Sequence, residues 1–503
     1  MGWNLNENLI SAARTYPNRD AFIFMNESVT YSEFNQKVDR FAFALSAQGV
    51  EKGDTVALLL GNSPQFLIAY YGILRIGAAA VPMNPIYTTD EITYILSDCK
   101  AKAVIAIPSQ KPNLSALQEK LHHLELIIYT EPDDSPSSFE SLLKQANPDF
   151  ESPSLSEEDL AVILYTSGTT GKPKGAMLSH RNMASNAEST ISFLNLNSKD
   201  RVVAVLPMFH VFCMTVCMNA PISSGATILI LPRFSPAEVV RSIHQHKATV
   251  FAGVPTMYNF LLQLPDASAD DLSSLRVCVS GGAAMPVELL VKFENHYRTV
   301  ILEGYGLSEA SPVTAFNPLE GVRKPGSIGL DIPRVKNKVV DPDGNEVPRG
   351  KVGELIVQGP NVMLGYLGMP EATALALRDG WLYTGDMATM DEDGYIFIVD
   401  RKKDMILVGG YNVYPREVEE VLYQHPFVLE AAVIGVPDEE YGERVKACIV
   451  KKDQSLSAAD ILAFCQDKLA KYKVPRQVEF MEELPKNTTG KILRKALKTT
   501  VQI

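Results

Sequence analysis

The sequence lacks the features of several large classes of protein. Its six cysteines form no CxxC pair and stand beside no histidine cluster, so neither a zinc site nor a disulfide framework is indicated. No apolar run reaches the length of about 18 residues that a membrane-spanning helix needs, and the N-terminus lacks the pattern of a signal peptide. Acidic residues outnumber basic ones, 59 to 47, which excludes the basic surface of a general nucleic-acid-binding protein. We therefore expect a cytoplasmic protein.

What the sequence has is the composition of a large globular protein. Its 503 residues are 46% hydrophobic, which is enough for two to four domains or subdomains. Over about the first 400 residues, short apolar runs such as 54–60 alternate with amphipathic stretches such as 63–77, whose apolar residues recur with a helical period. Apolar strands separated by helices predict largely parallel sheets that are covered on both faces, and hence an α/β fold.

The pattern changes after about residue 337. Segments 336–359 and 391–400 alternate apolar and polar residues around Asp-Gly turns, which predicts antiparallel hairpins. A Gly-Gly turn then leads into a helix that starts at Pro415. The last 100 residues or so contain enough apolar segments for a small α+β domain. We predict a large N-terminal domain at 1–400, with parallel-sheet subdomains and a β-barrel-like subdomain, a boundary at 401–404 and a C-terminal domain at 405–503.

Residues 165–175 read YTSGTTGKPKG and follow the apolar run AVILY, which is typical of a buried strand. Glycines allow close backbone approach, hydroxyl groups donate hydrogen bonds and lysines supply positive charge, and together these suit a polyphosphate. The residues concerned are Thr166, Ser167, Gly168, Thr169, Thr170, Gly171, Lys172, Lys174 and Gly175. The stretch is not a Walker A loop, because only two residues separate its inner glycines and proline follows Lys172. It predicts a phosphate site, and the alternative is a mobile surface loop.

Other stretches carry groups that suit a nucleotide. Segment 279–286, VSGGAAMP, has small residues that leave room for a flat ligand, although a tight turn explains it equally well. In ILEGYGLSEASPV, residues 301–313, Tyr305 could stack on a base and Glu309 could hold Mg²⁺. Asp386 follows a glycine and could accept hydrogen bonds from ribose, or it could be a simple turn residue. Lys491 lies in a polar loop, where an isolated lysine is more often part of a solvated basic tail.

Five motifs in order resemble those of the adenylate-forming enzymes. They are TSGTTGKPKG, YGLSE, YTGD, DRKKD with GGYNVYP, and PKNTTGKILR, and they cover essentially the whole chain. This superfamily comprises acyl-CoA synthetases, adenylation domains of peptide synthetases and beetle luciferases. The resemblance implies that Mg-ATP converts a carboxylic acid to an acyl-adenylate and pyrophosphate, after which a thiol, usually CoA, displaces AMP. ATP, Mg²⁺ and CoA would be the cofactors.

The resemblance also assigns roles to residues. Lys491, His210, Glu309, Ser308 and Lys403 would be catalytic, and Glu309 with Thr169 would bind the metal. ATP and AMP would be bound by Thr166, Ser167, Gly168, Thr169, Thr170, Gly171, Lys174, Gly281, Gly282, Ala283, Glu303, Gly304, Tyr305, Gly306, Ser308, Asp386 and Arg401. Ser308 stands where the family commonly has threonine, which keeps the hydroxyl group and loses a methyl group.

The second half-reaction would require a movement of the small domain. In this family that domain rotates about a residue two positions after the arginine of the DR pair, which is Lys403 here. The rotation would withdraw Lys491 and bring in Gly409, Gly410 and Tyr411 to line a channel for the pantetheine arm of CoA. The C-terminal domain is therefore expected to be mobile.

The substrate is indicated by the segment LPMFHVFCMTVCMNAPISSG, residues 206–225. PMFHVF resembles an acyl-CoA synthetase motif, so His210 would stand beside the reacting carboxylate, with Phe209, Met214 and Met257 around an apolar tunnel. Gly304 occupies a place near which dicarboxylate-activating relatives carry a basic residue. We expect a medium- or long-chain fatty acid as substrate, with transient membrane contact and a monomer or homodimer.

Other functions remain open at this point. A coumarate-type ligase for aromatic acids is the nearer alternative. A fatty acyl-AMP ligase that serves a carrier protein is a more distant one. A nucleotide-binding regulatory protein without activity is a third, although the joint presence of Lys491, Asp386, Arg401 and Glu309 argues against it.

Overall fold

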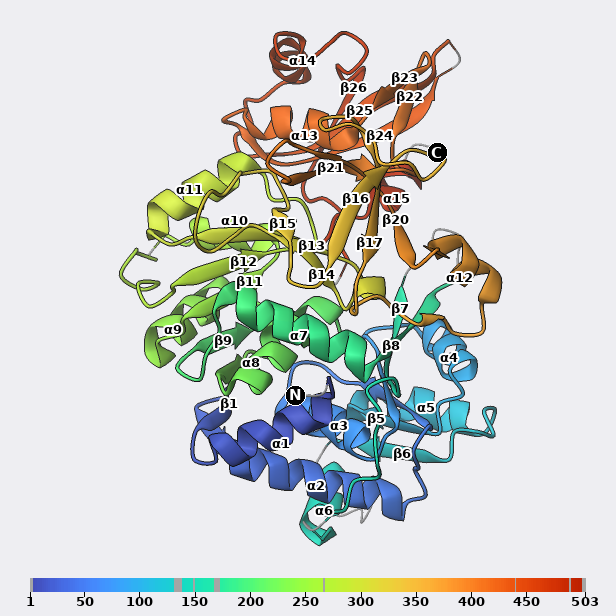
Figure 1. Ribbon diagram of the computed structural model, residues 1–503. Helices are drawn as coiled ribbons and strands as arrows, with labels where there is room; N and C mark the ends of the chain where they lie inside the picture. Colours follow the sequence, from blue (N-terminus) through green and yellow to red (C-terminus); the bar gives the residue numbers. More distant parts are fainter. Residues whose placement is uncertain are drawn as a thin grey trace.

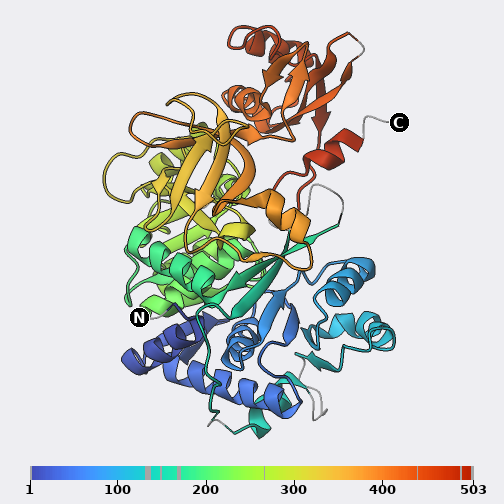
Figure 2. The same cartoon turned by 45° about the vertical axis from the view of Figure 1, so that its right-hand side comes forward.

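The structure is a computed structural model, and it describes residues 3–130, 138–147, 150–166, 172–265, 267–438, 440–487 and 490–499. Two large sheets with helices form the body, and a smaller lobe made from the end of the chain caps one end of it (Figures 1 and 2). In the described part of the chain, every helix is too short or too polar to traverse a lipid bilayer. All six cysteines are buried and free.

The first large sheet has nine strands in the order β15-β14-β13-β12-β11-β9-β10-β1-β2. Neighbouring strands from β13 to β1 run parallel, and antiparallel pairs are added at the two ends of the sheet, by β14 and β15 at one end and by β2 at the other. The bounds are β1 Asp20–Phe24, β2 Glu27–Thr30, β9 Arg201–Ala204, β10 Thr227–Ile230, β11 Val250–Gly253, β12 Val277–Ser280, β13 Ile301–Gly306, β14 Val313–Phe316 and β15 Leu330–Asp331. The predicted parallel sheet is confirmed here.

The second large sheet has seven strands in the order β18-β8-β7-β4-β3-β5-β6. Its bounds are β3 Thr55–Leu59, β4 Ala79–Pro82, β5 Ala103–Ala106, β6 Leu126–Tyr129, β7 Leu160–Thr166, β8 Lys174–Ser179 and β18 Gly365–Tyr366. Strand β8 follows the predicted phosphate loop, residues 167–173, and returns antiparallel to β7. Helix α7, His180–Leu194, starts directly after this hairpin.

Helices cover the two sheets and join them into one core. The predicted helix at 63–77 is α3, Pro64–Arg75, which begins where the Ser63 hydroxyl accepts a hydrogen bond from the Phe66 amide and Pro64 fills the first turn. Helix α7 contacts β7 and β8 of one sheet and β14 of the other. The remaining helices of the body are α1 Leu5–Thr15, α2 Tyr31–Ala47, α4 Thr89–Asp98, α5 Lys111–Gln118, α6 Phe139–Gln145, α8 Ala220–Ser224, α9 Pro236–His246, α10 Pro255–Leu262, α11 Val287–Tyr297 and α12 Pro370–Ala376.

A third sheet is antiparallel and carries the chain toward the end lobe. It contains β16 Lys336–Val340, β17 Gly353–Gln358, β19 Leu377–Arg378, β20 Trp381–Met390 and β21 Ile396–Arg401. The predicted hairpins are present in it, since β16 pairs with β17 and β20 with β21. The part that we expected to be β-barrel-like is a five-stranded sheet with β16 and β19 at its ends.

The end lobe has a sheet and a hydrophobic core of its own. Its elements are β22 Ile406–Val408, β23 Tyr411–Val413, α13 Pro415–Tyr423, β24 Val428–Asp438, β25 Gly442–Lys451, α14 Ala458–Gln466, β26 Gln477–Met481 and α15 Arg494–Thr499. Its core is built from residues such as Val418, Val433 and Ile461. The exact boundary at 401–404 stays a prediction.

Two arginines fix the end lobe against the body. Arg416, near the start of α13, donates hydrogen bonds to the carbonyl oxygens of Ile398 at 2.9 Å and Gly326 at 3.3 Å. Arg494 donates to both carboxylate oxygens of Glu419 at 2.8 Å, and its guanidinium lies 3.8 Å from the Asp400 carboxylate. These contacts hold the loop that carries Lys491 against the body.

Candidate active site

The predicted phosphate loop connects β7 to β8, and two lysines at its C-terminal end lie over tyrosine rings. Thr166 and Lys174 are paired across the hairpin. The Lys174 ammonium lies 5.0 Å from the centre of the Tyr366 ring, and the Lys172 ammonium lies 5.6 Å from that of Tyr94. The predicted binding residues Ser167, Gly168, Thr169, Thr170 and Gly171 lie outside the described residues.

Tyr305 and Asp386 come together from different sheets. Tyr305 lies near the end of β13, and its phenol donates a hydrogen bond to the Asp386 carboxylate in β20. Asp386 is paired with Arg401 across β20 and β21, which brings the Arg401 guanidinium to 3.2 Å from Asp386 Oδ1. An aromatic ring, a carboxylate and a guanidinium therefore lie side by side. An aromatic ring can stack on a nucleotide base, and a carboxylate can accept hydrogen bonds from ribose hydroxyls.

Ser308 and Glu309 begin a short 3₁₀ helix, η3 Ser308–Ala310, directly after β13. Glu309 Oε1 accepts a hydrogen bond from the Tyr366 phenol at 2.9 Å, and the Glu309 carbonyl accepts one from the Met363 amide at 2.9 Å. Among the described residues, no three acidic, histidine or cysteine side chains form a metal cage. One carboxylate suits Mg²⁺ that is shared with phosphate, because Mg²⁺ usually binds through one or two carboxylates and the substrate.

Lys491 is presented by a tight turn against the body. The Lys491 amide donates to Asn487 Oδ1 at 2.9 Å, and a Cβ added at Gly490 would lie 2.9 Å from Thr256 Oγ1 and 3.0 Å from Val254. Burial, followed by the positive charge of Arg401, lowers the pKa of Lys491 from 10.5 to about 8, against the opposing effect of Asp386. A buried cation of this kind gains stability when an anion binds beside it.

The charge of Lys491 also acts on His210. Burial, together with the nearby Lys491 charge, lowers the pKa of His210 to about 4, so the imidazole is neutral at pH 7. Its Nδ1 accepts a hydrogen bond from the Phe212 amide at 3.3 Å, which places the ring proton on Nε2. His210 can therefore donate one hydrogen bond into the site.

The glycines around β12 and β13 are required by close packing. A Cβ at Gly281 would lie 3.2 Å from the Phe212 ring, and Gly282 has a φ of +78° in the turn that leads to Ala283. A side chain at Gly304 would overlap the Phe316 ring, and one at Gly306 would overlap the backbone of Pro312. Gly304, which we interpreted as a sign of the substrate, thus has a sufficient packing reason.

Glu303, which we expect to contact the nucleotide, has its carboxylate bonded to the protein backbone. Its side chain is 5% exposed, and its carboxylate accepts hydrogen bonds from the amides of Met285 at 3.2 Å and Gly326 at 3.1 Å. Burial raises its pKa to about 7, although the charge of Arg416 opposes this. Glu303 therefore supports the backbone behind the site and the contact with the end lobe.

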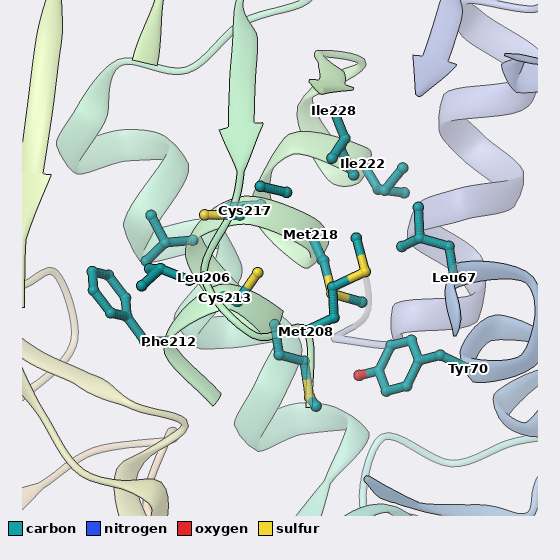
Figure 3. Close-up of a cluster of buried hydrophobic side chains, with 14 of the residues drawn as sticks. Leu67, Tyr70, Leu206, Met208, Phe212, Cys213, Cys217, Met218, Ile222 and Ile228 are labelled. Carbon is teal, nitrogen blue, oxygen red and sulfur yellow. The ribbon is translucent and has the colours of Figure 1, made fainter. Parts of the chain in front are cut away.

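The predicted acyl-pocket residues separate into two groups. Phe209 and His210 are half-buried beside the site, and Met257 is 8% exposed in α10. Met214 is fully buried in a π-helical segment, η2 Cys213–Asn219, within the main core. Figure 3 shows neighbouring side chains of this segment packed with Met208, Leu67 and Tyr70. Met214 therefore contributes to the core.

The predicted CoA residues and the predicted hinge are in the end lobe and in the turn before it. Gly409 and Gly410 have φ of +56° and +85° and form the turn between β22 and the edge strand β23. Tyr411 is 61% exposed and stacks on Tyr472 at 4.9 Å, inside the end lobe. Lys403 is exposed in the turn after β21. The structure thus brings Lys491, not the Gly409–Gly410 turn, to the body.

Two residues at the site were missed by sequence reasoning. Tyr366 contacts both Glu309 and Lys174, and Arg416 joins the end lobe to the body. The available signals were the motif GYLGMP around Tyr366 and the arginine that follows Pro415 in NVYPREVEE. Neither pattern shows that its residue contacts another one 57 or 90 positions away in the sequence.

The chain matches the family of AMP-binding enzymes over residues 9–367 and the AMP-binding enzyme C-terminal domain over 417–491. It is 40% identical to a long-chain-fatty-acid–CoA ligase of Bacillus subtilis, with 97% of this chain and 93% of the relative covered. It is also 38% identical to a feruloyl-CoA synthase of an Amycolatopsis species, with 96% of each covered.

A solved structure with a similar fold is that of ATP-bound MatB from Rhodopseudomonas palustris. It is 34% identical, with a TM-score of 0.94 over 100% of this chain and 99% of that chain. The apo structure of the same protein gives a TM-score of 0.83 with the same coverage. This chain as a whole is therefore more similar to the ATP-bound structure than to the apo structure.

Proposed function

The chain belongs to the family of AMP-binding enzymes and is an acid–thiol ligase that uses ATP, Mg²⁺ and CoA, and we propose that its acid is a medium- or long-chain fatty acid. The ligase relatives at about 40% identity support the fatty acid, and so do two apolar residues, Phe209, which directly precedes His210, and Met257 in α10. The observation that carries the mechanism is the position of Lys491, whose neighbour Gly490 packs against Thr256 and Val254 of the body.

In the proposed first half-reaction, the fatty carboxylate attacks the α-phosphorus of ATP. A bond from the carboxylate oxygen to phosphorus forms, and the bond from phosphorus to pyrophosphate breaks. Lys491 screens the repulsion between the two anions, since a preorganised cation in a buried site stabilises the charge that develops. Neutral His210 would donate from Nε2 to an oxygen of the carboxylate.

The other residues would bind and orient the nucleotide. Asp386 would accept hydrogen bonds from the ribose hydroxyls, with Arg401 beside it, and Tyr305 would pack on the adenine. Glu309 would hold the Mg²⁺ that accompanies ATP, which when bound neutralises phosphate charge. Thr166 and Lys174 would flank the β- and γ-phosphates together with the loop between them.

In the proposed second half-reaction, the end lobe rotates about Lys403. Lys491 leaves the site, and the turn at Gly409 and Gly410 with Tyr411 lines the path of CoA. The thiolate sulfur attacks the acyl carbon, and the bond from that carbon to the AMP oxygen breaks. Domains of 1–400 and 405–503 joined by 401–404 fit this movement, because residues 401–403 are exposed.

An aromatic-acid ligase of the coumarate type is the second candidate. The feruloyl-CoA synthase at 38% identity supports it, and its coverage of both chains is as complete as that of the fatty-acid ligases. We also propose transient contact with a membrane surface in the cytoplasm, where a fatty acid partitions, and a monomer or homodimer.

One mass-spectrometric assay tests the substrate. The protein with Mg-ATP and CoA is given hexanoate, dodecanoate, hexadecanoate, benzoate, coumarate or malonate. Dodecanoyl-CoA or hexadecanoyl-CoA with stoichiometric AMP is the expected result. Aryl-CoA would establish the aromatic class instead, and acyl-adenylate without thioester would indicate an enzyme that serves a carrier protein.

A further inference from the structure

Tyr366 is held in place by its backbone beside the phosphate loop. It belongs to the short strand β18, where it pairs with Ala176 of β8. The next residue, Leu367, donates its amide to the Gly175 carbonyl at 2.8 Å. On the other side, the Tyr366 amide donates to Thr373 Oγ1 at 2.9 Å. The ring is therefore fixed relative to the strand that carries Lys174.

The Tyr366 side chain connects two groups that face the ATP site. Its phenol donates to Glu309 Oε1 at 2.9 Å, and the Lys174 ammonium lies 5.0 Å from its ring centre. Burial, and then the Glu309 charge, raises the pKa of this phenol well above its ordinary value, so it remains a proton donor. Glu309 Oε2 has no hydrogen-bond partner in the described part of the chain.

We propose that Tyr366 is a positioning residue that orients the Glu309 carboxylate toward the Mg²⁺ of Mg-ATP. The inference rests on the proposed role of Glu309. A glutamate side chain has several rotamers, and a hydrogen bond to Oε1 restricts them while Oε2 stays free for the cation. Mg²⁺ demands nearly ideal octahedral geometry, so the orientation of each ligand affects its affinity.

The test measures how much Mg²⁺ strengthens ATP binding in the absence of acid. Calorimetry gives the Kd of ATP in EDTA and in excess Mg²⁺, and their ratio is the Mg²⁺-dependent gain. Tyr366→Phe removes the hydroxyl group and keeps the ring over Lys174. We expect the gain to fall by about tenfold, the effect typical of losing a partner of a metal ligand. The Kd in EDTA should stay within about twofold of the wild-type value, because the hydrogen bond acts through the metal ligand.

Tyr94→Phe is the matched control. Tyr94 also contacts the end of the loop. Its phenol donates to the Pro173 carbonyl at 3.0 Å, and the Lys172 ammonium lies 5.6 Å from its ring centre. It has no contact with Glu309 among the interactions of the described residues, so the Mg²⁺-dependent gain should be unchanged. Glu309→Gln should lose the gain, and adding Tyr366→Phe to it should cause no further loss.

The outcomes distinguish this inference from the proposal it rests on. If Glu309→Gln keeps the gain, the role of Glu309 is wrong and the inference fails with it. If Glu309→Gln loses the gain but Tyr366→Phe keeps it, only the inference about Tyr366 is overturned. An equal loss of ATP affinity with and without Mg²⁺ in Tyr366→Phe would also overturn it, because a merely structural role produces that pattern.

Discussion

Replacing Lys491 with alanine should separate the two half-reactions. The structure gives the size of the effect through the pKa of Lys491, which falls from 10.5 to about 8. At 1.36 kcal/mol per pKa unit this is about 3 kcal/mol of unfavourable charge burial, which the anions of the reaction can recover. The loss of one preorganised donor from an active site costs a similar amount, about 100- to 1,000-fold in rate.

The assay follows each half-reaction separately. Exchange of labelled pyrophosphate into ATP reports adenylate formation, and Lys491→Ala should lower its rate by about 100- to 1,000-fold. Transfer from chemically supplied acyl-adenylate to CoA should stay within about threefold of wild type, a difference of less than 1 kcal/mol. Lys498→Ala is the control, since Lys498 is an exposed lysine in α15. An equal loss of both half-reactions, with the fold intact, would refute the alternation of the end lobe.

The pH dependence gives an independent test of the same residue. A lysine with a pKa of about 8 carries its proton below that pH and loses it above. The kcat/KM for adenylate formation should therefore decline above about pH 8, since this parameter reports the free enzyme. The thioester half-reaction should lack this decline. A flat profile for adenylate formation up to pH 10 would contradict the low pKa.

Three further predictions concern stability and the orientation of the end lobe. His180 is fully buried with no hydrogen-bond partner for either ring nitrogen in the described structure, and burial lowers its pKa from 6.5 to about 4. The imidazole of His180 therefore takes up a proton near pH 6.5 in the unfolded chain but stays neutral in the folded one. As the pH falls from 7.5 to 5.5, the free energy of unfolding, measured in urea, should therefore decrease by about 1.4 kcal/mol more in wild type than in His180→Phe. Arg416→Gln removes two hydrogen bonds between the end lobe and the body, so pyrophosphate exchange should slow by about tenfold and proteolysis at 401–404 should accelerate. Transfer from acyl-adenylate to CoA should be retained. An unchanged rate of pyrophosphate exchange would contradict this prediction. Gly304→Ala forces a methyl group against the Phe316 ring and should lower the free energy of unfolding by about 1–3 kcal/mol, measured by thermal denaturation; wild-type stability would show that Phe316 yields freely.

The sequence by itself determined the elements and the chemistry of the motifs. Apolar runs such as 160–165 became buried strands, and the helix after Ser63 begins at its capping residue, because hydrophobic period and cap chemistry are local properties. The order of the five motifs was enough to indicate the family, which the comparisons then showed. None of this required knowledge of how the sheets pack.

Tertiary structure alone decided which side chains meet. Tyr366 reaches Glu309 across 57 residues of sequence, and Arg416 reaches the Gly326 carbonyl across 90. The same packing turned Glu303 inward to two amides and lowered the pKa of Lys491 by burial against the body. Local patterns contain no record of these contacts, because they depend on sheet order and on the position of the end lobe. Desolvation likewise becomes defined only when distant segments have packed together.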